Sequence, residues 1–157
     1  YNYDPDAQLD NDNVPELGTE IDLVDLGPLR MLSIPGELLP ELAIGGFDGS
    51  HTQIGEYTDA IVDLDQANPA DLSLAPEGPF LKEVMGQTYN WIIGLGNDEL
   101  GYIIPEYNYI LSDRLPYLQE ADGDHYEETN SLGPGTAALV DEWANRVISW
   151  NPGSEGN

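Results

Sequence analysis

Two short stretches of the sequence place a reactive side chain next to residues that let the backbone turn sharply. In the first, Glu37 follows Pro35-Gly36 at the end of an apolar run and precedes a short helical pattern. Proline fixes the direction of such a turn, and glycine allows another segment of backbone to approach closely. A carboxylate held there can act as a metal ligand or a general base. Glu37 is therefore a candidate site residue, and the plain alternative is a solvated surface acid.

The second stretch covers residues 91–105 and sets an apolar segment against a glycine-rich turn, Gly94-Leu95-Gly96-Asn97. This turn is not a dinucleotide-binding fingerprint, because the third glycine is absent and no βαβ unit follows. A phosphate loop is also a poor fit to so acidic a chain. We interpret the turn as a tight connection that leads into Tyr102. We expect this stretch and Pro35-Gly36-Glu37 to meet in space and to carry the chemistry.

The other residue types that could bind a metal or act in catalysis exclude several kinds of site. The chain has no cysteine, which excludes disulfides, thiolate zinc sites and cysteine nucleophiles. Its two histidines, His51 and His125, cannot make a three-histidine zinc site, and both lie in acidic stretches where a lone histidine is usually not a ligand. No serine lies in a Gly-x-Ser-x-Gly elbow, so a serine hydrolase has no support. A calcium-dependent binding module is a further alternative, using Asp10, Asp12, Asp122 and Asp124.

The net charge of the chain limits the classes of partner that it can bind. Its 157 residues include 30 acidic and 4 basic ones, for a net charge of -26 and a pI near 4.1. Nucleic-acid affinity rests on Lys and Arg that neutralise phosphates, so we exclude nucleic acid as a partner. With 40% hydrophobic residues the chain is too apolar for a disordered acidic tail, and we expect a folded core inside an acidic shell. No apolar run reaches the roughly 18 residues that span a bilayer, so we do not expect an integral membrane protein.

The elements that must position Glu37 and Tyr102 are short strands and helices. Gly27-Pro28 separates two aliphatic runs, which predicts a β-hairpin or two consecutive strands. A helix with Pro40 in its first turn follows Glu37 and ends at Gly45-Gly46. The last helix should present one broad apolar face made of Leu139, Val140, Trp143, Val147, Ile148 and Trp150. The predicted strands are 20–26, 29–34, 89–95 (buried) and 102–104, and the predicted helices are 38–44, 79–85 (beginning with Pro79) and 134–150.

These elements predict an α+β fold with a mixed β-sheet layer and flanking helices. Residues 1–18 are an acidic lead-in. Residues 47–78 form a long acidic loop, which we expect to be a functional rim or a cover for another part of the protein. The strands are few for a self-contained sheet, and the chain opens with Tyr1 and not Met. We therefore expect a preceding N-terminal segment.

At three stretches the sequence resembles the neutral ceramidase family, particularly its bacterial ceramidase-like members. The stretches are Pro35-Gly36-Glu37, then Gly94-Leu95-Gly96-Asn97 with Gly101-Tyr102, then Tyr126-Glu127 leading to Gly133-Pro134. Their order and approximate spacing agree across most of the chain. The family's histidine ligands and its Gly-Asp-Val-Ser-type motif have no counterpart here. The resemblance thus identifies residues 1–157 as the C-terminal portion of such a catalytic domain, within a larger αββα-type fold.

The resemblance implies a zinc-dependent amidase that cleaves the N-acyl bond of ceramide. On this basis Glu37 and Tyr102 are zinc ligands, and an N-terminal segment supplies two histidines. Tyr102 is also catalytic as an oxyanion donor, and Tyr126 is a catalytic and substrate-binding residue near the scissile amide. The chain would be inactive alone, with a lipid or other amide as substrate and an extracellular or periplasmic location. The competing hypothesis is a non-catalytic acidic surface or assembly protein that keeps the fold.

Overall fold

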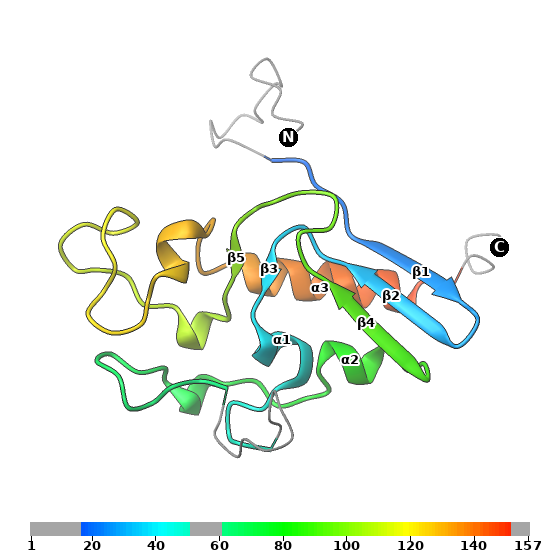
Figure 1. Ribbon diagram of the computed structural model, residues 1–157, viewed down its shortest axis with the longest axis horizontal. Helices are drawn as coiled ribbons and strands as arrows, with labels where there is room; N and C mark the ends of the chain where they lie inside the picture. Colours follow the sequence, from blue (N-terminus) through cyan, green and yellow to red (C-terminus); the bar gives the residue numbers. More distant parts are fainter. Residues whose placement is uncertain (1–16, 51–60, 152–157) are drawn as a thin grey trace.

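A computed structural model describes residues 17–50 and 61–151, and its first element is the predicted hairpin (Figure 1). Strand β1 (Asp22–Leu26) pairs antiparallel with β2 (Leu29–Ser33), and Gly27 in the turn between them has a φ of 61°. Strand β4 (Tyr89–Ile93) then pairs in parallel with β2, which gives the sheet order β1-β2-β4. The predicted α+β class with a mixed sheet is therefore confirmed. Membership of a larger αββα-type domain stays a prediction.

Helices α2 (Leu81–Val84) and α3 (Thr136–Ser149) cover one face of this sheet. In Figure 1, α3 runs behind the strands. The main core lies between these layers, where apolar side chains leave water and stabilise the fold. Its buried members are Leu32, Ile34, Leu81, Met85, Ile103, Ala137, Val140 and Ala144.

A second, two-stranded sheet lies beside the first and holds both candidate stretches. Strand β3 (Glu37–Leu38) pairs in parallel with β5 (Tyr102–Ile103). Helix α1 (Pro40–Ile44) follows β3 and ends at Gly45, as predicted, but it begins at Pro40 and not at residue 38, because Leu38 belongs to β3. Glu37 therefore lies in a strand that follows the Pro-Gly turn, and helix α1 begins only after Leu39.

The described parts of the 47–78 loop build a second apolar cluster. Val62 and Ala70 pack with Tyr107, which belongs to the 3-10 turn η2 (Glu106–Asn108). The Phe47 ring lies edge-on to Tyr107, with ring centroids 5.7 Å apart. The loop also contains the 3-10 turn η1 (Leu72–Leu74). The loop thus covers the η2 end of the fold, which agrees with the second of its two predicted roles.

Three local predictions need correction. Helix α2 begins at Leu81 and not at Pro79, because Phe80 is the cap and its N–H donates to the Glu83 carboxylate at 2.8 Å. Strand β4 is not a buried strand, because its alternate residues are exposed. In α3, Ala137, Val140 and Ala144 form the buried stripe, whereas Leu139, Trp143 and Trp150 of the predicted apolar face are exposed.

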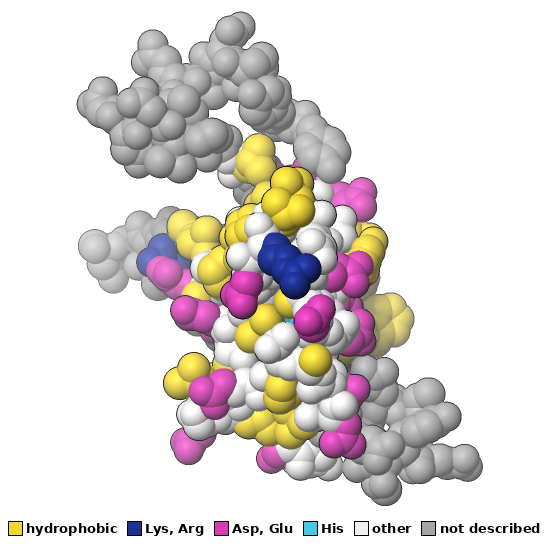
Figure 2. All heavy atoms as spheres, turned by 90° about the vertical axis from the view of Figure 1, so that its left-hand side faces the viewer, with side chains coloured by type: hydrophobic (Ala, Val, Ile, Leu, Met, Phe, Trp, Pro, Cys, Tyr) yellow, Lys and Arg dark blue, Asp and Glu magenta, His cyan; other side chains and the backbone are white. Residues whose placement is uncertain are grey.

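Acidic side chains are spread over the surface. On the face shown in Figure 2 they alternate with apolar and neutral groups and do not gather into one patch. Among the described residues, no helix has the length and apolar character needed to cross a membrane.

Candidate functional site

Glu37 and Tyr102 lie directly opposite each other in the register of the β3–β5 pair. The Glu37 N–H donates to the Gly101 carbonyl at 3.0 Å, and the Leu39 N–H donates to the Ile103 carbonyl at 3.2 Å. Residues opposite each other in a strand pair project their side chains to the same face of the sheet. The two candidate stretches therefore meet in space, as predicted.

Two glycines make this pairing possible. A Cβ atom at Gly36 would collide with the Gly101 carbonyl oxygen and crowd the Ile103 side chain. Gly101 has a φ of 82°, and a Cβ there would overlap the Asn130 carbonyl oxygen. Each glycine thus lets a neighbouring backbone approach closely. The close backbone approach explains why glycine precedes Glu37 and Tyr102 in this chain.

The glycine-rich turn after β4 wraps around the start of β3. The Leu95 N–H donates to the Gly36 carbonyl at 3.0 Å, and the Leu100 N–H donates to the Pro35 carbonyl at 2.8 Å. Leu95 and Asn97 have positive φ angles of 55° and 72°, which mark a sharp turn. The turn therefore fixes the backbone of Pro35-Gly36 and leads into Tyr102, as the sequence indicates.

Tyr126 completes the group from a third segment. Its ring lies edge-on to Tyr102, with centroids 6.0 Å apart and an interplanar angle of 76°. Ser131, farther along the same segment, forms an isolated parallel bridge with Tyr102. All three residues that the sequence singles out thus lie together, and we call Glu37, Tyr102 and Tyr126 the Glu-Tyr-Tyr site.

The electrostatics of this site keep Tyr102 in its neutral form. Burial raises the pKa of the Tyr102 phenol, and the negative charge of Glu37 raises it further. Both effects disfavour a phenolate. Glu37 is exposed and Tyr126 is half exposed. The site therefore presents a carboxylate and a protonated phenol side by side at the surface.

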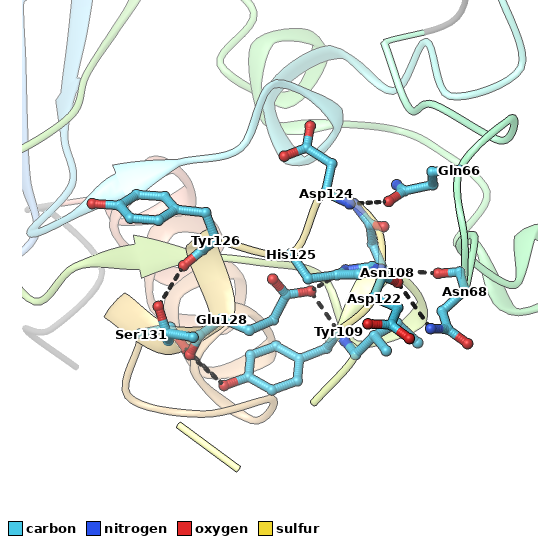
Figure 3. Close-up of polar contacts among 12 residues, drawn as sticks. Gln66, Asn68, Asn108, Tyr109, Asp122, Asp124, His125, Tyr126, Glu128 and Ser131 are labelled. Atoms are coloured by element: carbon cyan, nitrogen blue, oxygen red, sulfur yellow. Dashed lines mark hydrogen bonds and ion pairs between the residues drawn. The ribbon is translucent and has the colours of Figure 1, made fainter. Parts of the chain in front are cut away.

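A buried polar pair anchors the segment that carries Tyr126 (Figure 3). His125 and Glu128 are 1% and 3% exposed, and His125 Nδ1 lies 3.0 Å from Glu128 Oε1. The other ring nitrogen, Nε2, lies 3.0 Å from the Asn68 carbonyl oxygen. Glu128 Oε1 also accepts a hydrogen bond from the Ile110 N–H at 3.1 Å. In Figure 3 the Tyr126 ring points away from this pair, so the pair holds the backbone and leaves the ring at the site.

Ser131 is fixed by a second contact. Its hydroxyl and the Tyr109 hydroxyl are 2.7 Å apart, and it also donates to the Glu128 carbonyl at 3.1 Å. The 3-10 turn η3 (Glu127–Asn130) thus lies between two anchors, one at His125 and one at Ser131. This arrangement fixes both ends of the turn beside Tyr102.

A polar pocket of about 200 Å³ lies next to the start of helix α1, where Leu39, Pro40 and Glu41 line it. Its lining includes the carboxylates of Glu41, Asp63, Asp124, Glu127 and Glu128. Glu41 is 4% exposed and accepts a hydrogen bond from Asn108 Nδ2 at 3.2 Å. Burial raises the pKa of Glu41. The 47–78 loop contributes to this pocket through residues 61–63 and Gln66, but Glu37 and Tyr102 do not line it.

A larger apolar groove of about 820 Å³ follows α3. Pro35, Leu100 and Leu132 are among its lining residues, as are Leu139 and Trp143 of the helix, whereas the three residues of the Glu-Tyr-Tyr site do not line it. This groove explains why the predicted apolar face of α3 is wider than its buried stripe.

The remaining sequence predictions have mixed outcomes. Asp10, Asp12 and His51 lie outside the described residues. Asp122 and Asp124 are engaged through their backbones, because the Asp122 carbonyl accepts from Asn68 and the Asp124 N–H donates to Gln66. Across 17–50 and 61–151, no group of three or more His, Cys, Asp or Glu residues is arranged to hold a metal. A calcium site stays a prediction.

Sequence reasoning missed the buried pair and Glu41. His125 was interpreted as a loop histidine, although its partner Glu128 follows three residues later, a spacing that brings side chains together on a helical turn. That spacing was the available signal. Nothing in the local sequence indicates that Asn68 supplies the second acceptor.

Comparisons with protein-family models, curated proteins and solved structures gave no match to this chain. The resemblance described above therefore rests on its motifs.

Proposed function

We propose that the Glu-Tyr-Tyr site is the carboxylate and phenol part of a zinc-dependent amide hydrolase. The histidine ligands would come from another polypeptide segment. The observation that supports this most directly is the register of β3 and β5, which sets Glu37 opposite Tyr102 with Tyr126 against it. The resemblance to neutral ceramidases names the same three residues.

The donor set fits zinc in part. Zinc in proteins is held by about four ligands, drawn from carboxylate, imidazole and thiolate groups. An exposed carboxylate beside a phenol supplies two oxygen donors. The described residues offer no third acidic, histidine or cysteine side chain in a suitable group. A second segment with histidines is therefore part of the proposal.

Each residue has a distinct role. Glu37 would hold the metal, which when bound polarises an amide carbonyl and lowers the pKa of bound water. Tyr102 would be a weaker ligand or, as a neutral phenol, would donate a hydrogen bond to the oxygen that gains charge; its raised pKa disfavours the phenolate. Tyr126 is half exposed beside Tyr102 and would orient the amide. The substrate class is an N-acyl amide, with a ceramide-like lipid as first choice.

The test supplies the absent histidines as free imidazole. The full chain is titrated with Co²⁺, a spectroscopic substitute for zinc, with and without imidazole. We expect visible absorption bands of tetrahedral Co²⁺ only with imidazole, and their loss in Glu37→Gln and Tyr102→Phe. Hydrolysis of a fluorogenic N-acyl amide is then measured with Zn²⁺ and imidazole. Glu77→Gln is the matched control, because Glu77 is an exposed glutamate away from the site.

The control matters because a chain with a net charge of -26 attracts divalent cations to its whole surface. Equal Co²⁺ spectra for Glu37→Gln, Glu77→Gln and the unmodified chain would refute the zinc site. A site that binds Co²⁺ but gives no imidazole-dependent hydrolysis would refute the amidase activity.

The second candidate function is a non-catalytic assembly protein. The observation in its favour is the incomplete donor set among the described residues. It predicts a chain that associates with a partner and binds no zinc at Glu37. An extracellular or periplasmic location belongs to the first proposal and rests on the resemblance.

A further inference from the structure

The face of the β1-β2-β4 sheet opposite the helices is apolar, and no described residue covers it. Side chains alternate between the two faces of a strand, and Leu32 and Ile92 point into the core. The register then places Val24, Met31 and Trp91 in one outward row and Leu26, Leu29 and Tyr89 in the next. The most exposed members are Val24 (44%), Leu26 (59%), Tyr89 (58%), Trp91 (56%) and Ile93 (43%). We call these two rows and Ile93 the outer sheet face.

This sheet lacks the polar outer face of a sheet with one solvated side. Such a sheet turns its apolar side chains inward and its polar ones outward. Here the helix-facing side carries Arg30, which donates to the Met85 carbonyl at 2.8 Å. It also carries Asn90, which donates to the Lys82 carbonyl at 3.1 Å. The sheet is therefore apolar on both sides, and the polar groups on its inner side already have partners. This indicates that a second layer packs on the outer sheet face.

The outer sheet face is also almost free of charge, in a chain that carries 30 acidic residues. Of the outward positions in the three strands, only Asp22 carries a charge at neutral pH. It lies at a corner and accepts a hydrogen bond from Asn97 at 2.7 Å. The other aspartate of β1, Asp25, lies on the inner side of the sheet, where its Oδ1 is 2.7 Å from Arg30 Nε. Two copies of this face can therefore meet without placing carboxylates against one another.

The size of the side chains on the outer sheet face differs between its two edges. Strand β4 presents the large side chains of Tyr89 and Trp91, whereas β1 presents the smaller Val24 and Leu26. A two-fold axis along β2 turns the sheet over and lays β4 of one copy across β1 of the other. Large side chains then face small ones in both halves of the contact, which is the isologous arrangement of a symmetric dimer.

We propose that the outer sheet face is the interface of a homodimer, formed by stacking the β1-β2-β4 sheets of two copies. Nothing in this proposal requires zinc or the Glu-Tyr-Tyr site. The electrostatics give it a characteristic salt dependence. Two chains of charge -26 repel each other across solvent, and added salt screens that repulsion. Association should therefore strengthen with ionic strength, whereas binding to a basic partner would weaken.

The experiment is sedimentation velocity of the full chain over a concentration series, from low to molar NaCl. We expect the 17.2 kDa monomer at low salt and a species of twice that mass at high salt. Trp91→Ser should weaken dimerisation at least tenfold. It should leave the circular dichroism spectrum unchanged, because the Trp91 side chain is already half exposed.

Trp143→Ser is the matched control, since Trp143 is 49% exposed but lies on α3. Its dimerisation should equal that of the unmodified chain, which separates a specific interface from general salting-out of apolar surface. A monomer at every salt concentration would overturn the proposal. Equal loss of dimer in both variants would overturn it too, as would a dimer that Trp91→Ser leaves intact.

Discussion

The imidazole of His125 and the carboxylate of Glu128 lie 3.0 Å apart, and both side chains are almost completely buried. The second ring nitrogen of His125 faces the Asn68 carbonyl oxygen, also at 3.0 Å. Each ring nitrogen of His125 therefore has an oxygen partner inside the fold. These two contacts tie the Tyr126 segment to the 47–78 loop.

The first prediction concerns this pair. His125→Ala should lower the free energy of unfolding by about 2 kcal/mol or more, because it leaves a cavity and removes a hydrogen-bond partner from the buried Glu128 side chain. The measurement is urea denaturation of the two single variants and of His125→Ala with Glu128→Ala. Since the residues are in contact, the double variant should lose less stability than the two single losses combined. Additive losses would show that the pair does not act as a unit.

The second prediction concerns the backbone contact behind Tyr102. Gly101→Ala should destabilise the protein by about 2 kcal/mol or more, because the new methyl group overlaps the Asn130 carbonyl at a positive φ. Gly135→Ala is the control, since a Cβ at Gly135 meets no atom within 4 Å. Thermal unfolding of both variants checks the result. Equal melting temperatures would contradict the close approach of β5 and residue 130.

The third prediction is a pH dependence that comes from Glu41. Burial raises its pKa above the ordinary value of 4.5, so the folded state binds a proton more tightly than the unfolded chain. Stability from this group is present below pH 4.5 and is lost as the pH rises through the folded pKa. Glu41→Gln removes that loss and keeps an acceptor for Asn108. We expect the variant to be more stable than the unmodified chain at pH 7, and to lose this advantage at pH 4.

Urea denaturation between pH 4 and pH 8 measures this effect. The gap between Glu41→Gln and the unmodified chain should widen with pH and then level off. Glu77→Gln, at an exposed position, should show no such trend. A gap that is constant with pH would mean that Glu41 has the same proton affinity in the folded and unfolded chains.

Local signals were enough to predict the hairpin and helix α1. Gly27-Pro28 separates two aliphatic runs, and Pro40 and Gly45 mark the limits of the helix; such features act through neighbouring backbone atoms. The parallel pairing of β2 with β4 has no such signal, because it joins strands separated by residues 34–88. The sequence likewise shows that residues 89–95 are apolar but not which side of β4 meets the core.

The candidate site likewise has some features that the local sequence predicts and others that it does not. Pro35-Gly36-Glu37 and Gly101-Tyr102 could be recognised because their glycines serve a close approach of two backbones. The contacts that fix the Tyr126 segment could not be predicted, because Asn68 and Tyr109 reach that segment from distant loops. Polar contacts between loops depend on tertiary position and leave no periodic pattern in a sequence.

The last prediction compares a buried tyrosine, Tyr107, with a partly buried one, Tyr109. Tyr107 is 6% exposed, and its hydroxyl is the only buried side-chain polar atom without a hydrogen-bond partner in the described part of the chain. Burial also raises its pKa, so the group stays neutral and its unmade hydrogen bond is a net cost. Tyr107→Phe removes that cost and keeps the ring contact with Phe47. We expect the variant to gain about 1 kcal/mol in unfolding free energy.

Tyr109→Phe is the matched comparison, because the Tyr109 hydroxyl is 2.7 Å from Ser131 Oγ. It should lose about 1 kcal/mol, since one hydrogen bond that fixes the Tyr126 segment disappears. A gain in unfolding free energy for one Tyr→Phe substitution and a loss for the other would distinguish an unsatisfied hydroxyl from a hydrogen-bonded one. A loss of stability in Tyr107→Phe equal to that in Tyr109→Phe would show that the Tyr107 hydroxyl has a partner in solution, such as a bound water molecule.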